Sequence, residues 1–355
     1  MSEKLLKVGI LGCGPIAQIG HLEACQKARN VDLYAVCDAA EDLANKMAAF
    51  YGAKKVFLSY EEMLKDPAVD LILIATGDYF HVPGTIMALE AGKHVLVEKP
   101  MALYVDSAQN LVDAVEKSGL ICQIGHNKRF DPGIFSAYHF VKEELGEMIA
   151  YKGWYCDSTH RYAATDSVQP VIHSSKNSVK PLKNPKEDLR QYYMLAHGSH
   201  LVDLAYYLAG PIEKVTVSLR EKQGIYSWFV DTHFESGTHG HLDLTVAIRD
   251  DWSEGFEIYG SEGTVRANIF NPWYMKPAQV RCFSERKGTY SEVLNNDANT
   301  YKLQIEHLAE VIMKGKKQIG ATAQEGLASV KAMVAINQSA TTGKTVYLNQ
   351  VTGTV

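Results

Sequence analysis

Several features that would place a protein in a specialised class are missing from this sequence. The six cysteines are scattered and none forms a C-x-x-C pair, so neither a metal site nor a disulfide framework is indicated. No apolar run is long enough to cross a bilayer, and the first residues lack the pattern of a signal peptide. We therefore expect a cytoplasmic protein with no membrane partner.

A basic surface of the kind that binds nucleic acid is also not indicated. Lys and Arg number 36 against 41 Asp and Glu, which gives a formal net charge of −5. Hydrophobic residues make up 46% of the 355 residues, so the chain can form a sizeable core, and its length suits two domains better than one. A small-molecule partner is expected rather than a nucleic acid.

The first 125 residues alternate short apolar runs with helical stretches. Runs such as "VDLILIAT" and "HVLVEKP" are nearly continuous in apolar residues, which is typical of parallel strands covered on both faces. This pattern predicts an α/β Rossmann domain with a doubly wound parallel sheet over residues 1–125.

Residues 126–355 have a different pattern. Apolar and polar residues alternate in runs such as "HGHLDLTVAIRD", which predicts an α+β domain with a large, mostly antiparallel open sheet. Two helices, at about 299–314 and 323–340, are expected to follow, and the C-terminal helix can pack back on the first domain. We expect the second domain to bind substrate and to mediate oligomerisation.

The stretch "VGILGCGPIAQIGH" runs from an apolar strand into closely spaced glycines. Gly12 permits a tight turn, Gly14 allows the main chain to approach a pyrophosphate, and Ala17 lets the next helix pack on the strand. Asp38 follows the second strand, where a carboxylate can bind the hydroxyls of a ribose. The four residues together predict a dinucleotide site rather than an ordinary turn.

The residues after Asp38 favour NAD over NADP. The 2′-phosphate of NADP needs a nearby cation, but Glu41 and Asp42 follow, and the next basic residue is Lys46. A basic residue from a distant part of the sequence is the one feature that would reverse this preference.

Lys99 lies within "VLVEKPMA", directly after the fifth strand. Ligands of open α/β sheets bind beyond the carboxyl ends of the strands, so Lys99 is expected in the cofactor crevice. A positively charged nicotinamide would lower the pKa of this lysine and make it an acid/base candidate. Pro100 makes the corner rigid. A solvated lysine in a turn is the alternative.

Five motifs in order resemble the Gfo/Idh/MocA oxidoreductases: the glycine loop, "IATGDYFH", "EKP", "GHNKRFDP" and "HGSHLVDLAYYLAG". The resemblance implies a Rossmann domain followed by an open-sheet domain. It further implies that His200 faces the hydride-transfer site and is catalytic with Lys99. The residues it places at the cofactor are Gly12, Gly14, Pro15, Ile16, Asp38, Ala75, Thr76, His81, Glu98, Lys99 and Asn127. Arg129 is placed beside the same pocket.

The sequence departs from the family pattern near His200. Many members carry an Asp four residues earlier, where this chain has Ala196, followed by His197. Either His197 or a loop residue takes over the task of that acid, or the chemistry differs from ordinary alcohol oxidation. Asp203, one turn beyond His200, is expected to be structural.

A long polar stretch between about 154 and 193 contains aromatic and basic residues suited to binding a sugar. Trp154 and Arg161 are its candidate substrate contacts, together with Lys99, Arg129, His197 and His200. An arm that contacts another subunit explains the same stretch equally well.

We expect NAD-dependent transfer of hydride between the nicotinamide and a secondary alcohol of a sugar, sugar derivative or cyclitol. Two alternatives are open: a lyase or glycosidase that oxidises its substrate transiently, and a catalytically silent dinucleotide sensor. A homo-oligomer, dimer or tetramer, is expected to form through the open sheet.

Overall fold

The computed structural model describes residues 4–158, 167–179, 185–294 and 297–355. The chain divides into two compact units. Unit 1 comprises Met1–Asn127, Gln169–Glu187 and Asn299–Leu327, and unit 2 comprises Lys128–Val168, Asp188–Ala298 and Ala328–Val355. The division after Asn127 lies near the expected boundary at residue 125. Two segments that the sequence assigned to the second domain, 169–187 and 299–327, are grouped with unit 1.

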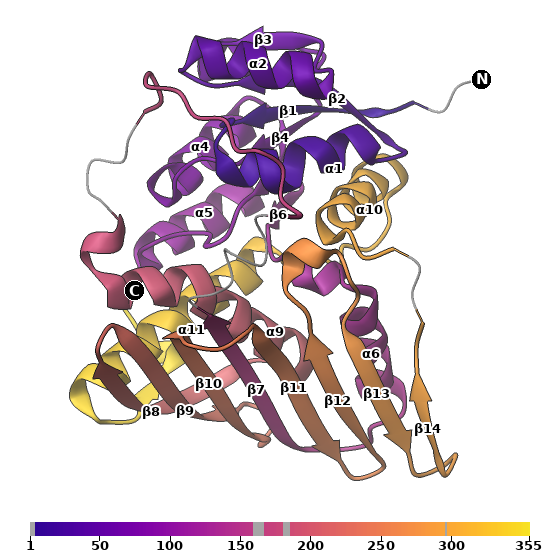
Figure 1. Ribbon diagram of the computed structural model, residues 1–355, viewed down its shortest axis with the longest axis vertical. Helices are drawn as coiled ribbons and strands as arrows, with labels where there is room; N and C mark the ends of the chain where they lie inside the picture. Colours follow the sequence, from indigo (N-terminus) through magenta and orange to yellow (C-terminus); the bar gives the residue numbers. More distant parts are fainter. Residues whose placement is uncertain (1–3, 159–166, 180–184, 295–296) are drawn as a thin grey trace. The chain divides into compact units, whose positions relative to one another are not determined.

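Unit 1 is built on a six-stranded parallel sheet with the strand order β3-β2-β1-β4-β5-β6 (Figure 1). Its strands are β1 (Leu6–Leu11), β2 (Val31–Cys37), β3 (Lys55–Phe57), β4 (Leu71–Ile74), β5 (His94–Val97) and β6 (Cys122–Ile124). The parallel Rossmann sheet expected from the sequence is confirmed. The strand order reverses between β1 and β4, and ligands of such sheets bind at the carboxyl ends of the strands near this point.

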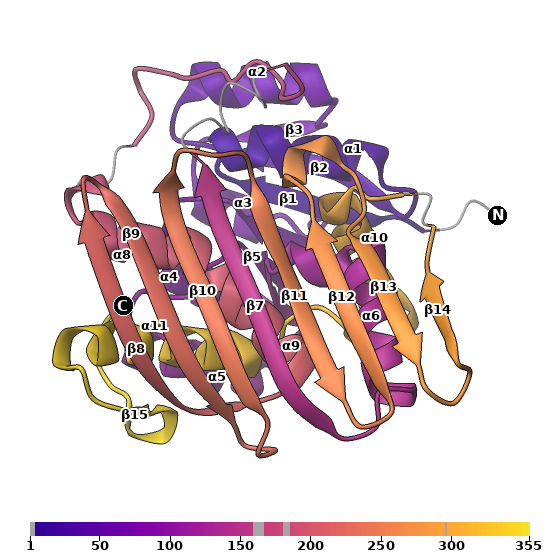
Figure 2. The ribbon, with the colours of Figure 1, turned by 60° about the horizontal axis from the view of Figure 1, so that its bottom comes forward.

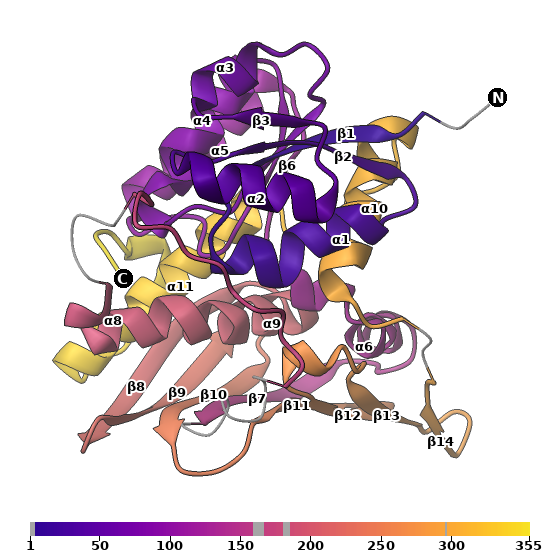
Figure 3. The same cartoon turned by 45° about the horizontal axis from the view of Figure 1, so that its top comes forward.

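Helices cover both faces of the parallel sheet (Figure 3). They are α1 (Leu22–Lys27), α2 (Glu41–Tyr51), α3 (Tyr60–Lys65), α4 (His81–Glu90), α5 (Val105–Ser118) and α10 (Thr300–Lys314), with the short turns η1 (Ala17–His21), η2 (Asp78–Phe80) and η4 (Pro185–Glu187). The turn η3 (Asn127–Phe130) begins with the last residue of this stretch of unit 1 and continues into unit 2. Because both faces are covered, strands such as β4 are buried at every position, which explains their unbroken apolar sequence.

Helix α10 completes the core of unit 1 although it lies far from the other elements in the sequence. Its residues Ile305, Leu308 and Ala309 belong to the same buried cluster as the apolar side chains of β1, β2, α1 and α2. Glu306 also fixes the turn before β2. It accepts hydrogen bonds from the Arg29 main-chain N–H (2.9 Å) and from the Arg29 guanidinium (3.1 and 3.0 Å).

Unit 2 is built on a nine-stranded sheet with the order β14-β13-β12-β11-β7-β10-β9-β8-β15 (Figure 2). All of its pairings are antiparallel except that of β7 with β10, so the expected large, mostly antiparallel sheet is confirmed. The strands are β7 (Met148–Ser158), β8 (Ile212–Lys222), β9 (Ile225–Phe234), β10 (His239–Ile248), β11 (Ser253–Gly260), β12 (Gly263–Ile269), β13 (Gln279–Ser284), β14 (Thr289–Glu292) and β15 (Val346–Tyr347).

One face of this sheet is covered by helices. Helix α6 packs on β12 and β13, and α9 packs on β7. The helical elements are α6 (Pro132–Glu143), α8 (Leu189–Tyr193), α9 (Ser199–Ala209) and the last part of α11 (Ala323–Thr342), with the turns η5 (Met194–Gly198), η6 (Pro272–Tyr274) and η7 (Leu348–Gln350). Within the described ranges, no helix combines the length and apolar character needed to cross a membrane.

The last residues of the motif "GHNKRFDP" begin helix α6, which the sequence patterns did not predict. Asp131 caps α6 by accepting hydrogen bonds from the N–H groups of Gly133 and Ile134, and Pro132 occupies the first helical turn. The same carboxylate accepts from the Ala278 N–H just before β13. This motif therefore ties a helix to the sheet of unit 2.

We predict that Glu306→Gln lowers the free energy of unfolding of unit 1 by about 1 kcal/mol, because it removes the charged partner of Arg29. Burial opposes ionisation of Glu306, but the hydrogen bonds and charge of Arg29 outweigh it and hold the carboxyl pKa below its usual range. A depressed native pKa adds stability above the usual glutamate pKa. That stability is lost as the pH falls through the native value.

Denaturant unfolding at several pH values tests this prediction. The difference between wild type and Glu306→Gln should be present at neutral pH and should vanish in acid. Glu23→Gln, which alters an exposed pair with Lys27 in α1, is the matched control and should change stability by only a few tenths of a kcal/mol. A difference that persists unchanged in acid would contradict the assignment.

Candidate active site

The glycine loop of unit 1 follows β1 and closely approaches the end of β4. Gly12 has a φ of +92°, and a Cβ at this position would lie 2.8 Å from the carbonyl oxygen of Ala75. Its N–H donates to the carbonyl of Cys37 at the end of β2 (2.8 Å). Only glycine satisfies both the backbone conformation and this close approach.

Gly14 has the opposite surroundings. A Cβ there would meet nothing within 4 Å, so the main chain is open to an approaching group at this point. Pro15 is exposed and Ile16 half-buried beside it, while Ala17 is buried and begins η1. An open glycine followed by a helical turn suits the pyrophosphate of a dinucleotide, and the contact stays a prediction.

Asp38 lies at the end of β2 beside this loop. Its carboxylate accepts hydrogen bonds from the N–H groups of Cys13 (2.8 Å) and Ala40 (2.9 Å). Each carboxylate oxygen has more than one lone pair, so Asp38 can accept further hydrogen bonds from ribose hydroxyls while it holds the loop.

A segment from a distant part of the sequence lies against the glycine loop. The side chain of Gln18 donates to the His173 carbonyl (2.8 Å) and accepts from the His173 N–H (2.9 Å). The Ser175 hydroxyl donates to Asp42 at the start of α2 (2.7 Å). Residues 169–179 therefore run past α1 and α2 within unit 1 (Figure 3), although the residue types of the stretch from about 154 to 193 predict substrate contacts or a subunit arm.

The corner after β5 carries Glu98, Lys99 and a cis peptide bond to Pro100. Glu98 is buried, and it accepts hydrogen bonds from His21 Nε2 (2.7 Å) and from the Lys99 N–H (3.0 Å). The ring of Tyr301 in α10 meets His21 edge to face. Burial opposes ionisation of Glu98, but His21 and the charge of Lys99 outweigh it, so its pKa lies below the usual range. Glu98 is therefore a carboxylate that fixes the backbone of the half-exposed Lys99.

Two predicted cofactor residues make contacts within the protein instead of facing outward. His81 is buried between two carbonyls, with Nδ1 2.7 Å from that of Pro100 and Nε2 3.3 Å from that of the half-buried Thr76. Asn127 is also buried and donates to the Thr300 hydroxyl at the start of α10 (2.8 Å). Both residues support the loops of this edge.

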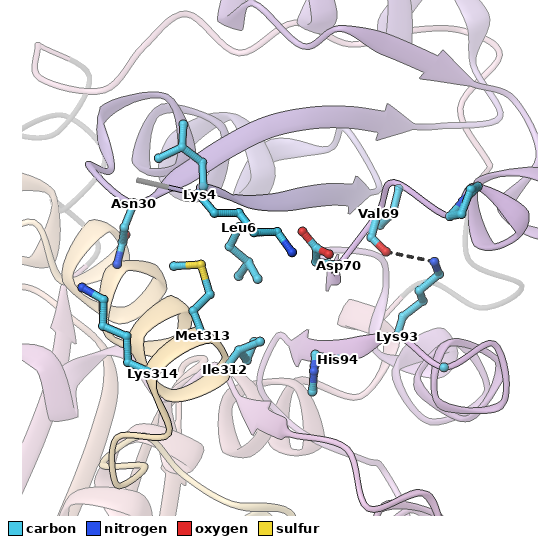
Figure 4. A pocket seen from close by; sticks show the side chains of 13 residues that line it. Lys4, Leu6, Asn30, Val69, Asp70, Lys93, His94, Ile312, Met313 and Lys314 are labelled. Carbon is cyan, nitrogen blue, oxygen red and sulfur yellow. Dashed lines mark hydrogen bonds between the residues drawn. The ribbon is translucent and has the colours of Figure 1, made fainter. Parts of the chain in front are cut away.

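A cavity of about 630 Å³ opens at the other end of the parallel sheet (Figure 4). Leu6, Asp70 and His94, at or next to the amino ends of β1, β4 and β5, contribute to its lining, and none of the predicted cofactor residues does. Lys93 points its ammonium group at the carbonyls of Val69 and Asp66. Because cofactors of such folds bind at the carboxyl ends, this cavity is separate from the predicted site.

Unit 2 contains a buried cluster of aromatic and titratable side chains of its own. His197 lies in the π-helical turn η5, and its Nε2 is 3.1 Å from Asp157 Oδ2 on β7. The Tyr155 hydroxyl is 3.4 Å from His197 Nδ1, and the Tyr155 ring stacks on the half-exposed His200 with an interplanar angle of 2°. Two of the predicted site residues, His197 and His200, are thus brought together.

Lys128 lies on the same cluster and was not singled out from the sequence. Its ammonium is 4.5 Å from the centre of the Tyr155 ring and forms a buried ion pair with Glu254. Burial lowers the pKa of Lys128 and raises that of Glu254, while each partner opposes the shift of the other. This pair supplies a fixed ionic neighbour for Tyr155.

The other predicted substrate contacts of this part of the chain are Arg129, Trp154 and Arg161. Arg129 is only 1% exposed and forms a multiple hydrogen-bonded ion pair with Asp203 (2.7–3.2 Å). Its expected place beside the substrate pocket is therefore corrected to a structural one, because a guanidinium engaged this way is not presented to a ligand. Trp154 lies on the sheet face opposite Tyr155, since successive strand residues alternate. Arg161 lies outside the described residues.

Comparisons with known proteins identify the family of this chain. A family model described as "Oxidoreductase family, NAD-binding Rossmann fold" matches residues 6–126, and a model of the "GFO/IDH/MocA C-terminal domain" matches residues 172–266. The two matches together span more than half of the chain. This chain belongs to the Gfo/Idh/MocA oxidoreductase family.

Relatives in this family include dehydrogenases of cyclitols. Myo-inositol 2-dehydrogenase of Thermotoga maritima is 26% identical over 270 residues, covering 74% of this chain and 75% of the relative. The scyllo-inositol 2-dehydrogenase (NAD(+)) of Bacillus subtilis is 24% identical over 331 residues, covering 89% of each. A solved structure of levoglucosan dehydrogenase with NADH has a TM-score of 0.81 at 20% identity and covers 98% of this chain and 100% of that one.

Several residues around the glycine loop and corner of unit 1, and in the cluster of unit 2, were not identified from the sequence. Alternation along β7 places Tyr155 and Asp157 on one face, and this signal was available in "WYCDS". Lys128 lies within the motif "GHNKRFDP", from which Asn127 and Arg129 were predicted to be site residues. His21 and Gln18 gave no comparable signal, because their partners are 77 and 155 residues away in the sequence.

We predict that Gly12 and Gly14 respond differently to substitution. Gly14→Val should leave stability within about 0.5 kcal/mol of wild type, because its side chain enters open space, yet weaken NADH binding roughly tenfold or more. Gly12→Ala should lower stability by about 1–3 kcal/mol, because of its positive φ and its clash with Ala75. Thermal unfolding and NADH fluorescence measure the two effects. Normal NADH affinity in Gly14→Val would contradict the pyrophosphate assignment.

Proposed function

We propose that this chain is an NAD-dependent oxidoreductase that moves hydride between the nicotinamide and a secondary alcohol of a sugar, sugar derivative or cyclitol. One observation carries the proposal. The open glycine loop, with Asp38 beside it, and the rigid corner that bears Lys99 follow strands of one parallel sheet at their carboxyl ends.

The residues present fit NAD. Gly14 leaves the space that a pyrophosphate needs, and Asp38 offers acceptors for ribose hydroxyls. The family assignment supports the same cofactor. When bound, NAD supplies the hydride acceptor for alcohol oxidation.

We assign proton handling to Lys99. An alcohol that loses hydride must also lose its hydroxyl proton, and a lysine amine can accept it. Glu98 anchors the main chain of Lys99, and His81 binds the carbonyl of Pro100, so the side chain extends from a fixed point. Fixed attachment reduces the conformational freedom that would otherwise weaken proton transfer.

The substrate class rests on the relatives and on the chemistry of unit 2. Two relatives are named as inositol dehydrogenases, and a similar structure is named as a levoglucosan dehydrogenase. Imidazole groups such as those of His197 and His200 can donate to and accept from the hydroxyls of such a ring. His200 is proposed as the second catalytic residue.

NAD is proposed over NADP because the acidic residues after β2 are held in place. Asp42 accepts a hydrogen bond from Ser175, and this bond lowers the pKa of its carboxyl. A fixed carboxylate near Asp38 would repel a 2′-phosphate.

A panel of sugars and inositols, assayed for NADH formation with NAD and NADP side by side, tests the proposal. We expect turnover with at least one cyclic polyol and a preference for NAD. Product formed without accumulation of NADH would indicate a lyase or glycosidase with transient oxidation. Tight NAD binding without turnover across the panel would indicate a sensor.

With an active substrate in hand, Lys99→Ala should lower kcat by about 10²- to 10⁴-fold, because the proton acceptor is removed. NADH affinity should stay within about threefold of wild type, since the pyrophosphate and ribose contacts remain. Lys117→Ala, which alters an exposed lysine of α5, is the control. Near-normal kcat in Lys99→Ala would reject the assignment.

We also propose that the chain forms a homo-oligomer, dimer or tetramer, through the outer face of the nine-stranded sheet. Phe229 is 50% exposed there, and strand pairing places it in one row with Asp243 and Trp154. Light scattering should show a dimer or tetramer for wild type and a smaller species for Phe229→Glu; a monomeric wild type would end this proposal. A cytoplasmic location stays a proposal, supported by the six unpaired cysteines.

A further inference from the structure

Many members of the family carry an Asp at the position of Ala196. In this chain a different carboxylate of unit 2, that of Asp157, lies beside an imidazole. We propose that Asp157, on strand β7, is the positioning residue that orients an imidazole in its place, and that this imidazole is His197. The inference rests on the proposed function, because it concerns the same alcohol oxidation. It assigns the orienting role to a residue of strand β7 and not to the position of Ala196 in the turn η5.

The pair is built into the fold. Asp157 and His197 are 6% and 7% exposed, and their polar atoms approach to 3.1 Å. His197 lies in η5, whose π-helical geometry precedes α9, and α9 packs on β7 (Figure 2). Turns of this type often occur at functional sites because the additional residue changes where a side chain points.

The contacts of the ring with Asp157 and Tyr155 favour one tautomer of the imidazole. A carboxylate only accepts hydrogen bonds, so with Asp157 ionised the proton belongs on Nε2 of His197. In the neutral ring, Nδ1 is then an acceptor, and the Tyr155 hydroxyl donates to it across 3.4 Å. Asp157 therefore selects one of the two tautomers of His197.

The orientation of His197 affects that of His200, the predicted catalytic histidine, through Tyr155. The Tyr155 ring lies parallel to the ring of His200, with centroids 6.0 Å apart. Lys128 lies 4.5 Å from the centre of the same Tyr155 ring and so helps to hold it. Asp157 thus acts on His200 through His197 and Tyr155, which makes it a positioning residue.

Other titratable groups surround the pair and shape its response to pH. Among the residues that the structure describes, Tyr155 of β7 and Tyr193 of α8 contact His197, and Lys128 of η3 lies near Asp157. His200 of α9 stacks on Tyr155, and Glu254 of β11 pairs with Lys128. Removing the carboxylate of Asp157 leaves all five of these groups in place. Because the charge of Asp157 also acts on the pKa of Lys128, the pH profile of Asp157→Asn is interpreted together with the tautomer of His197.

Asp157→Asn tests the proposal, because an amide has almost the same shape but can donate to Nε2. The ring can then adopt the other tautomer, as when a carboxylate beside a catalytic histidine is replaced by an amide. We expect ¹⁵N NMR of the histidine rings, assigned with His197→Gln, to show the proton of His197 moving from Nε2 to Nδ1. We also expect kcat to fall at least tenfold and the acidic limb of its pH profile to shift, with the KM for NAD unchanged.

Two further variants keep the test decisive. Tyr155→Phe removes only the hydroxyl and should shift the Nδ1 resonance of His197 and lower kcat by a smaller factor, even if Asp157→Asn folds poorly. The double variant Asp157→Asn with His197→Gln should be no slower than His197→Gln alone. Glu143→Gln disrupts an exposed His139–Glu143 pair on α6 and serves as the control, with wild-type kcat and pH profile expected.

The outcomes separate this proposal from the proposed function. A wild-type protein that oxidises no polyol ends the proposed function, while the NMR experiment still tests the pair. An active wild type whose Asp157→Asn variant keeps kcat within twofold and an unchanged pH profile overturns the positioning role. An unchanged His197 tautomer in Asp157→Asn, or unchanged Nδ1 resonance in Tyr155→Phe, overturns it as well.

Discussion

The buried contact between His21 and Glu98 links the two parts of unit 1 on which the proposed chemistry depends. His21 ends the turn that follows the glycine loop, and Glu98 begins the corner that carries Lys99. Glu98 remains a carboxylate because His21 and Lys99 outweigh the effect of burial on its pKa. One hydrogen bond of 2.7 Å thus joins the segment after the glycine loop to the corner that carries the proposed catalytic lysine.

In unit 2 the corresponding constraint is the alternation of side chains along β7. Tyr155 and Asp157 face the helices, whereas Trp154 faces the other side of the sheet, where Gly255 on β11 leaves room for its ring. Strand β7 thus contributes both to the buried cluster around His197 and His200 and to the outer face of the sheet. Composition alone could not separate these roles, since an aromatic residue near a polar loop suits a sugar site and an interface equally well.

Local patterns were sufficient to predict most of the fold. The apolar runs of β1, β4 and β5 identified a parallel sheet, and the alternation in β7 to β13 identified the antiparallel one. The glycine spacing and Asp38 predicted the loop geometry found around Gly12 and Gly14. Helix α6 was not predicted because its first residues lie inside the motif "GHNKRFDP", which was interpreted only through Asn127 and Arg129. Asp157, His21 and the segment around His173 could not be recognised with their partners, because those contacts join residues distant in the sequence.

The membership of α10 in the core of unit 1 has a consequence for how the polypeptide matures on the ribosome. The apolar surfaces of α1 and β2 are covered by side chains that are translated more than 250 residues later, as the separation of Arg29 and Glu306 by 277 positions illustrates. A nascent chain that has emerged only as far as residue 127 lacks this cover, so its hydrophobic surface stays exposed to solvent or to chaperones. The amino-terminal unit therefore completes its folding late, after most of the nine-stranded sheet has been synthesised.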